Sequence, residues 1–453
     1  MKKLFGTDGI RGIANRYPMT AQMAVRLGQA VAHHFKHRNR RTRILVGKDT
    51  RLSGYMFESA LAAGITSMGA DVMFVGPLPT PGIAFLTTDM RADAGIVISA
   101  SHNAYQDNGI KIFAGDGYKL PDAVEIQLET LALGGEGPDV LDQQLDPERI
   151  GRATRYEDST GRYIVFLKAA FPKNMTLDGL TIVVDCAHGA AYKVAPTVLE
   201  ELGAQVIALG NAPNGTNINH RCGSNNPNIA AARVLETGAD LGITLDGDAD
   251  RVILIDERGQ RIDGDHIMAL CAPWLKERGE LPYNTVVATV MSNLGLEIAL
   301  RHHDIDLVRT KVGDRYVVGE MRKHGYALGG EQSGHLIFRD FASTGDGMVA
   351  ALQVLGIMQS SGKPLSELTR VMQALPQTLI NVNVTTKPPL DSLEGVQAAI
   401  TEASRQLGDE GRVLVRYSGT ENKARVMVEG RDPRQIQGCA EAIAGAFGQA
   451  IGV

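Results

Sequence analysis

One strand-and-helix pattern of about a hundred residues occurs three times in this chain, and it constrains the fold more than any other feature of the sequence. Each copy has a β-branched strand, a helical stretch, a second strand after glycine and a third strand that ends in a polar loop. The third strands end before Ser101, Asp246 and Glu331. A helix that connects two strands forces parallel pairing, and parallel sheets place functional loops at the carboxyl ends of their strands. The repeat therefore predicts that these three loops lie close together.

The sequence beyond about residue 376 has a different character. We expect a strand at 379–384, an amphipathic helix around 393–407, two strands flanking 416–422 and a closing helix from Pro433. The predicted fold is α/β, with three related α/β domains that have mixed or parallel sheets and a C-terminal α+β domain. The domain boundaries that we expect are 1–152, 153–252, 253–368 and 369–453.

The composition excludes several classes of protein. The 453 residues are 44% hydrophobic and 21% charged, as in an ordinary globular protein, and are enough for roughly three or four domains. The net charge is −5, and the one basic run, 33–43, is interpreted as a helix end with a solvated face, so we expect no nucleic-acid partner. No apolar segment approaches the ~20 residues that a bilayer requires, so we expect no membrane partner. The four cysteines are scattered, and the first residues lack a signal-peptide core, which predicts a reduced, cytoplasmic protein.

The first polar loop contains a candidate nucleophile. Ser101 follows the apolar run 95–98, so its hydroxyl is expected in a tight turn at the carboxyl end of a strand, where open α/β sheets keep their chemistry. A serine in a loop is more often a turn former, and that alternative applies to Ser101 taken alone. Lys111, ten residues later, is interpreted as a proton carrier or as a surface charge. His102 is expected to shape the loop rather than to act as a base.

The second loop contains a candidate metal site. Asp246, Asp248 and Asp250 stand at alternate positions, and carboxylates this close raise one another's pKa unless a cation intervenes. Oxygen ligands favour Mg²⁺, Mn²⁺ or Ca²⁺ over zinc. Two features argue against an EF-hand: Arg251 stands where that loop needs glycine, and the flanks look like strands. A solvated acidic turn stays an alternative. A hydroxyl together with a hard-metal site indicates phosphoryl transfer.

Three further segments offer groups that suit a phosphorylated sugar. The loop 416–422 has guanidinium, hydroxyl and glycine-permitted N–H groups that match a phosphate, although a plain hairpin turn would have the same residues. The loop 331–335 has carboxylate and hydroxyl groups that suit sugar hydroxyls, and Arg11 in the turn 5–12 is a further phosphate candidate. The sequence has no Gly-x-x-x-x-Gly-Lys-Ser/Thr motif and no Gly-x-Gly-x-x-Gly that opens a helix, which argues against an ordinary nucleotide kinase or dehydrogenase.

Taken together, these residues resemble the α-D-phosphohexomutase superfamily along the whole chain. The characteristic stretches are Gly-Thr-Asp-Gly-Ile-Arg-Gly from Gly6, residues 214–219 with 222–224, and Gln332. The resemblance implies four domains around a central cleft, one Mg²⁺ per chain, a covalent phosphate on Ser101 and small-molecule sugar phosphates as substrates. Gln332 stands where members that act on glucose and mannose commonly have Met, so glucosamine phosphates are the expected substrates, on the route to UDP-N-acetylglucosamine.

The resemblance also implies a role for each matching residue. Ser101 would be the phosphoserine and would bind the metal together with Asp246, Asp248 and Asp250. Lys111, with Arg11 or His335, would form the acid–base set, and Arg251 would stabilise charge. The implied substrate contacts are Gly313, Asp314, Glu331, Ser333, Arg416, Ser418, Gly419, Thr420 and Arg425. Ala104, Tyr417 and Asn422 depart from the pattern of the superfamily without removing any of these groups.

Three alternatives to this function stay open at the level of sequence. They are a mutase that prefers glucose or mannose phosphates, a metal-dependent sugar-phosphate phosphatase, and a sugar-phosphate sensor without turnover. The oligomeric state is not determined by the sequence, and a homodimer is compatible with it. Because the phosphoryl donor would lie in the first domain and the phosphate anchor in the fourth, we expect turnover to need hinge opening near 360–375.

Overall fold

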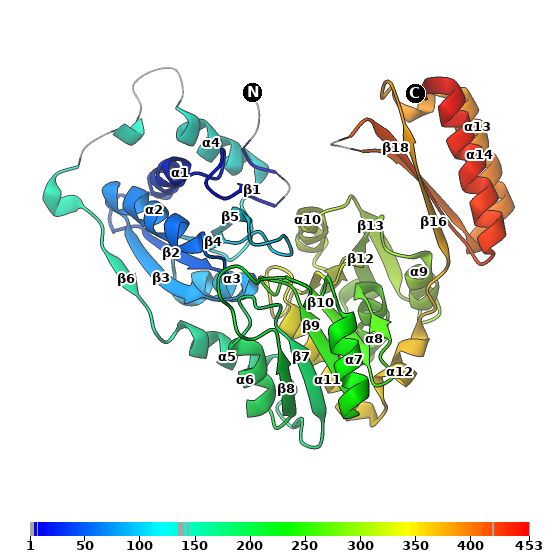
Figure 1. The fold of residues 1–453 in the computed structure, drawn as a ribbon, viewed down its shortest axis with the longest axis horizontal. Helices are drawn as coiled ribbons and strands as arrows, with labels where there is room; N and C mark the ends of the chain where they lie inside the picture. The colour runs from blue at the N-terminus through cyan, green and yellow to red at the C-terminus, as the bar shows by residue number, and fades with distance from the viewer. Residues whose placement is uncertain (1–3, 7, 135–139, 143–144, 419–420, 453) are drawn as a thin grey trace.

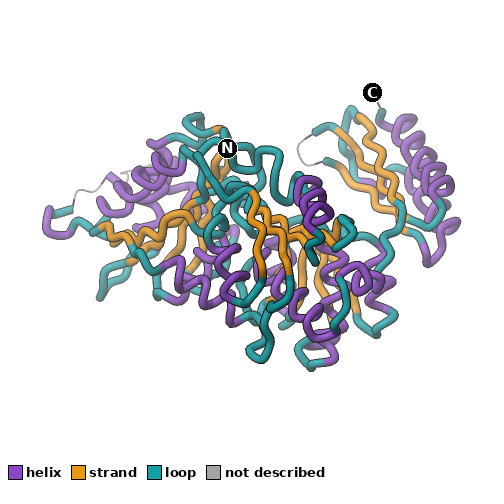
Figure 2. Tube along the Cα trace, turned by 60° about the horizontal axis from the view of Figure 1, so that its bottom comes forward, coloured by secondary structure: helices purple, strands orange, loops and turns teal. Residues whose placement is uncertain are grey.

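The computed structural model describes residues 4–6, 8–134, 140–142, 145–418 and 421–452. Within these residues, sheets of six, five, four and three strands follow one another along the chain. The first three sheets lie side by side with helices packed on them, and the fourth stands at the end of the row (Figure 1). Figure 2 shows the helices of the fourth sheet on the side that faces away from the rest of the molecule. The predicted fold class is confirmed.

The first sheet is mixed and has the strand order β1-β5-β4-β2-β3-β6. Its strands are β1 (Ile10–Ile13), β2 (Arg43–Lys48), β3 (Asp71–Pro77), β4 (Ala94–Ile98), β5 (Asp107–Ala114) and β6 (Ala153–Arg155). The helices of this part are α1 (Ala21–His34), α2 (Gly54–Ser67), α3 (Thr80–Asp89) and α4 (Asp122–Leu133). Strand β4 is buried at every position, as expected of an apolar run in a central strand of a sheet that is covered by helices.

The second and third sheets repeat this plan in shorter form. The second sheet, in the order β11-β10-β9-β7-β8, has β7 (Thr181–Asp185), β8 (Gln205–Leu209), β9 (Leu241–Leu245), β10 (Val252–Asp256) and β11 (Arg261–Ile262), with α5 (Ser159–Ala169), α6 (Val194–Glu201) and α7 (Asn228–Thr237). The third sheet, in the order β13-β12-β14-β15, has β12 (Thr285–Thr289), β13 (Asp306–Thr310), β14 (Leu328–Gly330) and β15 (Leu336–Phe338). Its helices are α8 (Gly264–Glu277), α9 (Leu294–Arg301), α10 (Asp314–His324), α11 (Gly347–Ser361) and α12 (Leu365–Leu368).

The three polar loops occupy equivalent places in these sheets. The loops connect β4 to β5, β9 to β10 and β14 to β15, and in each case the two connected strands pair antiparallel. The first strand of each pair also has a parallel neighbour, which is β2, β7 or β12. The carboxyl ends of β4, β9 and β14 therefore present Ser101, the aspartates and Glu331 from one topological position. The repeat predicted this position from the sequence alone.

The fourth sheet is antiparallel and has the order β16-β18-β17. Its strands are β16 (Gln377–Asn383), β17 (Arg412–Tyr417) and β18 (Lys423–Glu429), and its helices are α13 (Glu394–Leu407) and α14 (Pro433–Ile451). These elements match the strand, helix, strand pair and closing helix that the sequence predicted. Both helices are amphipathic, and they bury apolar residues such as Val396 and Phe447 against the sheet.

The hydrophobic core runs continuously through the first three sheets. One cluster of buried side chains includes Phe113, Tyr163, Leu245 and Leu352, whereas the fourth sheet has a core of its own around Phe447. The first three parts therefore form one body, to which the fourth is joined by the exposed segment that follows Met372. No helix in the described part of the chain is long and apolar enough to cross a bilayer.

The expected domain boundaries stay predictions. The first sheet extends to β6, which pairs with β3, and the second sheet extends to β11, which pairs with β10. Strands that follow the expected boundaries at 152 and 252 therefore still belong to the first and the second sheet.

Candidate active site

Ser101 lies in the turn after β4 and reaches toward the second sheet. Its backbone φ is 51°, a left-handed conformation that residues other than glycine keep only when their surroundings enforce it. Its side chain is buried, and Oγ donates a hydrogen bond of 2.6 Å to Oδ2 of Asp246. The first two predicted loops therefore meet at this hydroxyl.

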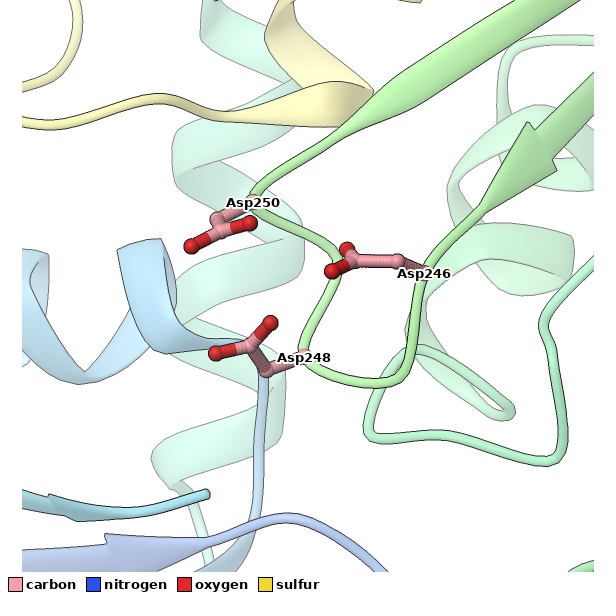
Figure 3. Close-up of side chains that lie close together, drawn as sticks. All are labelled: Asp246, Asp248 and Asp250. Carbon is pink, nitrogen blue, oxygen red and sulfur yellow. The ribbon is translucent and has the colours of Figure 1, made fainter. Parts of the chain in front are cut away.

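The three aspartates gather at the turn from β9 to β10 (Figure 3). One oxygen from each of Asp246, Asp248 and Asp250 lies within 4.8 Å of the others, and all three residues are buried. Oδ1 of Asp248 and Oδ1 of Asp250 have no hydrogen-bond partner among the described residues. Burial, and the charges of Asp250 and Asp248, raise the pKa of Asp246 well above its usual value. Buried, unpartnered carboxylate oxygens at this spacing fit a hard divalent cation.

Lys111, in β5, extends its ammonium group into the carboxylate cluster. Its Nζ lies 2.9 Å from Asp248 Oδ2, 3.4 Å from Asp250 Oδ2 and 3.2 Å from Asp8 Oδ2. Burial opposes the charge of Lys111, yet Asp248, Asp8 and Asp250 raise its pKa well above the usual value. The hydroxyl of Thr80 donates a hydrogen bond of 2.7 Å to Asp248 Oδ2. Lys111 is therefore an ammonium that balances part of the carboxylate charge.

Arg251 and His102 lie together beside the candidate nucleophile. Nη1 of Arg251 lies 3.1 Å from Nδ1 of His102, and the same Nδ1 is 3.4 Å from Ser101 Oγ. Burial and the charge of Arg251 lower the pKa of His102, so its ring is neutral at pH 7. Asp250 and Asp246 raise the pKa of Arg251, although burial opposes its charge.

His335 and Asp314 extend the cluster toward the third sheet. Nδ1 of His335 is 3.7 Å from Asp250 Oδ1, and its Nε2 is 3.6 Å from Asp314 Oδ2. The N–H of Gly345 donates to the same Nε2 at 3.1 Å, which places the proton of the neutral ring on Nδ1, toward Asp250. Burial opposes protonation of His335, yet Asp250 and Asp314 raise its pKa. Lys119 donates a hydrogen bond of 2.5 Å to Asp314.

A cavity of about 530 Å³ opens onto these groups. Its lining residues are Leu4, Phe5, Gly6, Asp8, Gly9, Arg11, Asp250, Arg251, Val312, Gly313, Asp314, Glu331 and His335. Arg11 forms an ion pair with Asp8 across this lining. Asp250 and Arg251 therefore share this cavity with five other residues that the sequence predicted as catalytic groups or substrate contacts. These are Arg11, Gly313, Asp314, Glu331 and His335.

A second cavity of about 530 Å³ shares Val312 and Glu331 with the first. It is also lined by Arg261, Asp263, Thr289, Met291, Gln332 and Ser333. Ser333 Oγ donates to one oxygen of Glu331 at 3.2 Å, and the N–H of Gly313 donates to the other oxygen at 3.1 Å. The predicted sugar loop therefore lies between the two cavities, with a carboxylate that is fixed in place.

The predicted phosphate loop stands apart from Ser101. Arg416 and Arg425 face each other in the register of β17 and β18, while Gly419 and Thr420 lie outside the described residues. Burial and the charge of Arg425 lower the pKa of Arg416. Nη2 of Arg416 lies 3.7 Å from Sδ of Met291, which lines the second cavity. Arg416 thus lies beside the second cavity, but the structure does not bring this loop to the nucleophile.

Several residues at the site lacked a sequence signal that singled them out. In the sequence, Asp8 is only one residue of a glycine-rich turn, and its position between Lys111 and Lys119 is a property of the fold. Lys119 and Thr80 belong to no motif. Asn219 was part of a characteristic stretch, but its donation of a 2.8 Å hydrogen bond to the carbonyl of Ser101 follows only from the structure.

One known protein family matches most of the chain. Models of the phosphoglucomutase/phosphomannomutase family match in order: α/β/α domain I at residues 2–136, domain II at 161–259, domain III at 263–375 and the C-terminal domain at 379–446. The chain belongs to the phosphoglucomutase/phosphomannomutase family and is an enzyme of the mutase class. The resemblance seen in the sequence is confirmed.

Curated relatives are similar along the whole chain. The chain is 59% identical over 453 residues to the phosphoglucosamine mutase of Syntrophotalea carbinolica, of which 98% is covered. It is 60% identical over 453 residues to the phosphoglucosamine mutase of Anaeromyxobacter sp. strain Fw109-5, of which 96% is covered. All of this chain is covered in both comparisons.

Solved structures of other family members share the fold. A phosphoglucomutase/phosphomannomutase family protein from Burkholderia thailandensis has a TM-score of 0.82 at 22% identity, with 99% of this chain and 97% of that chain covered. The N-acetylphosphoglucosamine mutase of Aspergillus fumigatus, in complex with GlcNAc-6P and magnesium, has a TM-score of 0.68 at 18% identity, with 99% and 96% covered.

Proposed function

We propose that this chain is a phosphoglucosamine mutase, which interconverts glucosamine 6-phosphate and glucosamine 1-phosphate through phospho-Ser101 and a sugar bisphosphate. The observation that carries the proposal is the 2.6 Å contact between Ser101 Oγ and Asp246, which joins a nucleophile to a carboxylate cluster. The relatives at 59% and 60% identity have this name, and Gln332 beside the second cavity agrees with an amino sugar as substrate.

Each half of the proposed cycle forms one P–O bond and breaks another. In the first half, a free hydroxyl of the sugar gives its proton to a basic group of the site and attacks the phosphorus on Ser101 Oγ. The P–Oγ bond breaks, the serine oxygen takes up a proton, and a sugar bisphosphate forms. The bisphosphate then turns around. In the second half, Ser101 Oγ gives up its proton and attacks the original phosphate. The bond between that phosphorus and the sugar oxygen breaks, and the sugar oxygen takes up a proton.

The chain's own charged groups suit the proton transfers. Lys111 is held as an ammonium by its carboxylate neighbours, so it gives a proton to the leaving oxygen. His335, whose Nδ1 faces Asp250, completes the acid–base set with Arg11. Arg251 stabilises charge on the transferred group.

Asp246, Asp248 and Asp250, together with Ser101, would hold one Mg²⁺. The buried, unpartnered Oδ1 atoms of Asp248 and Asp250 fit this ion, which when bound neutralises charge on the transferred phosphoryl group. The covalent phosphate on Ser101 would be the second group that the enzyme needs.

The substrate contacts that we propose divide between the two cavities and the fourth domain. Gly313, Asp314, Glu331 and Ser333 would contact the sugar, because they line either the cavity bordered by Asp250 and Arg251 or the second cavity, which shares Glu331 with it. The anchor for the substrate's own phosphate would be Arg416, Ser418, Gly419, Thr420 and Arg425. Because this loop stands apart from Ser101, we propose that the fourth domain swings on the segment 373–376, which is more exposed than the packed residues 365–372.

Mass spectrometry of the Ser101 peptide, paired with assays on glucosamine, glucose and mannose phosphates, tests this proposal. We expect phosphate on Ser101 at close to one per chain and a clear preference for glucosamine phosphates. Free inorganic phosphate as the main product would indicate a phosphatase. A higher kcat/KM for glucose or mannose phosphates would contradict the proposed substrate, and binding without turnover would contradict the mutase.

A further inference from the structure

We infer that Arg51 is a positioning residue, which fixes the turn of Ser101 and holds it in register with the aspartate loop of the second sheet. This inference rests on the proposed role of Ser101 as the carrier of the phosphoryl group. Arg51 lies between β2 and α2, outside the motifs that identified the site. Its side chain is 0% exposed, as is that of its ion-pair partner Asp49, with Nε and Oδ2 2.8 Å apart.

All five N–H groups of the Arg51 side chain have acceptors. Nε donates to Asp49, and the two terminal nitrogens donate to four backbone carbonyl oxygens, those of Ser101, Asn103, Ala104 and Asp107. The distances from Nη2 to the first two oxygens are both 2.8 Å. A planar guanidinium with five donors can gather a whole turn in this way, whereas a lysine ammonium has only three donors.

Asp49 holds the same turn through a second contact, with Ser99. Its Oδ2 accepts a hydrogen bond of 2.6 Å from Ser99 Oγ, and Ser99 Oγ accepts one of 2.9 Å from the N–H of Ser101. The amide and the carbonyl of Ser101 are therefore both tied to the Arg51–Asp49 pair. These ties account for the left-handed φ of 51° at Ser101, which needs enforcement from its surroundings.

The carbonyl that Arg51 holds is also the contact point with the second sheet. Asn219 Nδ2 donates to the oxygen of Ser101 at 2.8 Å and to the oxygen of Asn103 at 2.9 Å. Gly247, in the aspartate loop, packs so closely that a Cβ there would lie 2.6 Å from the Ser101 oxygen. A shift of this carbonyl would therefore move Ser101 Oγ relative to Asp246.

Arg51→Lys tests this role because it keeps the charge but replaces the planar guanidinium and its five donors by three donors on a single nitrogen. Misplacing a reacting group by about 1 Å costs roughly a hundredfold in rate, so we expect kcat for glucosamine 6-phosphate to fall about a hundredfold. Arg51 lines neither cavity, and we therefore expect KM to change by less than about threefold.

Asn219→Gly tests the same claim with little effect on folding. Asn219 has φ 58°, a conformation that glycine adopts without strain, so the substitution removes only the amide. We expect kcat about tenfold lower with KM unchanged. Arg221→Gly is the matched control, because Arg221 is exposed, lies in the same loop and has φ 54°. It should leave kcat at the wild-type value.

A single-turnover assay distinguishes positioning from folding. The rate at which ³²P passes from Ser101 to glucosamine 6-phosphate should fall in parallel with kcat, while the Tm of Asn219→Gly matches that of Arg221→Gly. Wild-type transfer rates in both Asn219→Gly and folded Arg51→Lys would overturn the inference. An equal loss of rate in Asn219→Gly and Arg221→Gly would also overturn it. Either result would leave the proposed function intact. A wild-type protein without mutase turnover would overturn the proposed function, and the inference with it.

Discussion

Replacing Asn293 by serine should loosen the attachment of the fourth domain. Asn293 is the N-cap of α9, where its Oδ1 accepts from the N–H of Gly295 at 2.9 Å. The same side chain accepts from the N–H of Leu375 at 2.9 Å and donates to the carbonyl of Leu375 at 3.0 Å and to Oε1 of Glu429 at 3.2 Å. Asn293 therefore joins α9, which packs on the third sheet, to the connecting segment 373–376 and to β18 of the fourth domain. Serine caps a helix about as well as asparagine but cannot make these three bonds.

The expected magnitude follows from the lost bonds. Asn293 is 5% exposed and Glu429 is 0% exposed, so each hydrogen bond counts about 1 kcal/mol, or about 3 kcal/mol in total. At 1.4 kcal/mol for each factor of ten, opening of the fourth domain should become about a hundredfold more frequent. Hydrogen–deuterium exchange of the 372–377 and 423–429 peptides measures this directly.

The control is Asn293→Ala, which removes the cap as well. It should cost about 1 kcal/mol more, and the extra loss should appear as faster exchange in α9 rather than in the fourth domain. Unchanged exchange of the 372–377 peptide in Asn293→Ser would refute the reasoning, because it would mean that Asn293 does not hold the connecting segment.

Three further predictions concern pH, metal and backbone. Burial and the charge of Asp263 raise the pKa of Asp265 to about 7, above the ~3.9 of an unfolded chain. The folded state therefore binds this proton more tightly, so stability should fall as pH rises from about 4 to about 7, and urea titrations of Asp265→Asn should lack that slope. Asp248→Asn should raise the Mg²⁺ concentration for half-maximal activity at least about tenfold in EDTA-treated enzyme, and an unchanged requirement would exclude Asp248 as a ligand. Gly334 has φ 93°, and a Cβ there would lie 2.0 Å from the carbonyl oxygen of Val252, so Gly334→Ala should lose at least about 2 kcal/mol of stability; a wild-type Tm would contradict this.

The centre of the site could be predicted from the sequence because its signals are local. Ser101 and the aspartates stand directly after apolar strands, and the repeat places those strands at equivalent positions in their sheets. Parallel pairing then places each loop at the carboxyl end of a strand in its own sheet. The 2.6 Å contact between Ser101 and Asp246 is the outcome that this reasoning anticipates.

The supporting residues could not be predicted, because their partners are distant in the sequence. Lys111 and Asp248 are 137 positions apart, and Asn219 and Ser101 are 118 apart, so no local pattern connects them. Arg51 follows a strand like many surface arginines, and only the fold shows that it is buried among carbonyl oxygens. The distance of the Arg416 loop from the nucleophile depends on the connection after Met372, on which hydrophobic periodicity has no bearing.

Rapid-quench transfer from enzyme labelled with ³²P on Ser101 tests the central claim most directly. After mixing with unlabelled glucosamine 6-phosphate and Mg²⁺, the label should leave Ser101 and appear in glucosamine bisphosphate at a rate at least as fast as kcat. Label that stays on the protein during turnover, or that is released as inorganic phosphate, would contradict the claim that this hydroxyl and the aspartates beside it transfer a phosphoryl group to the sugar.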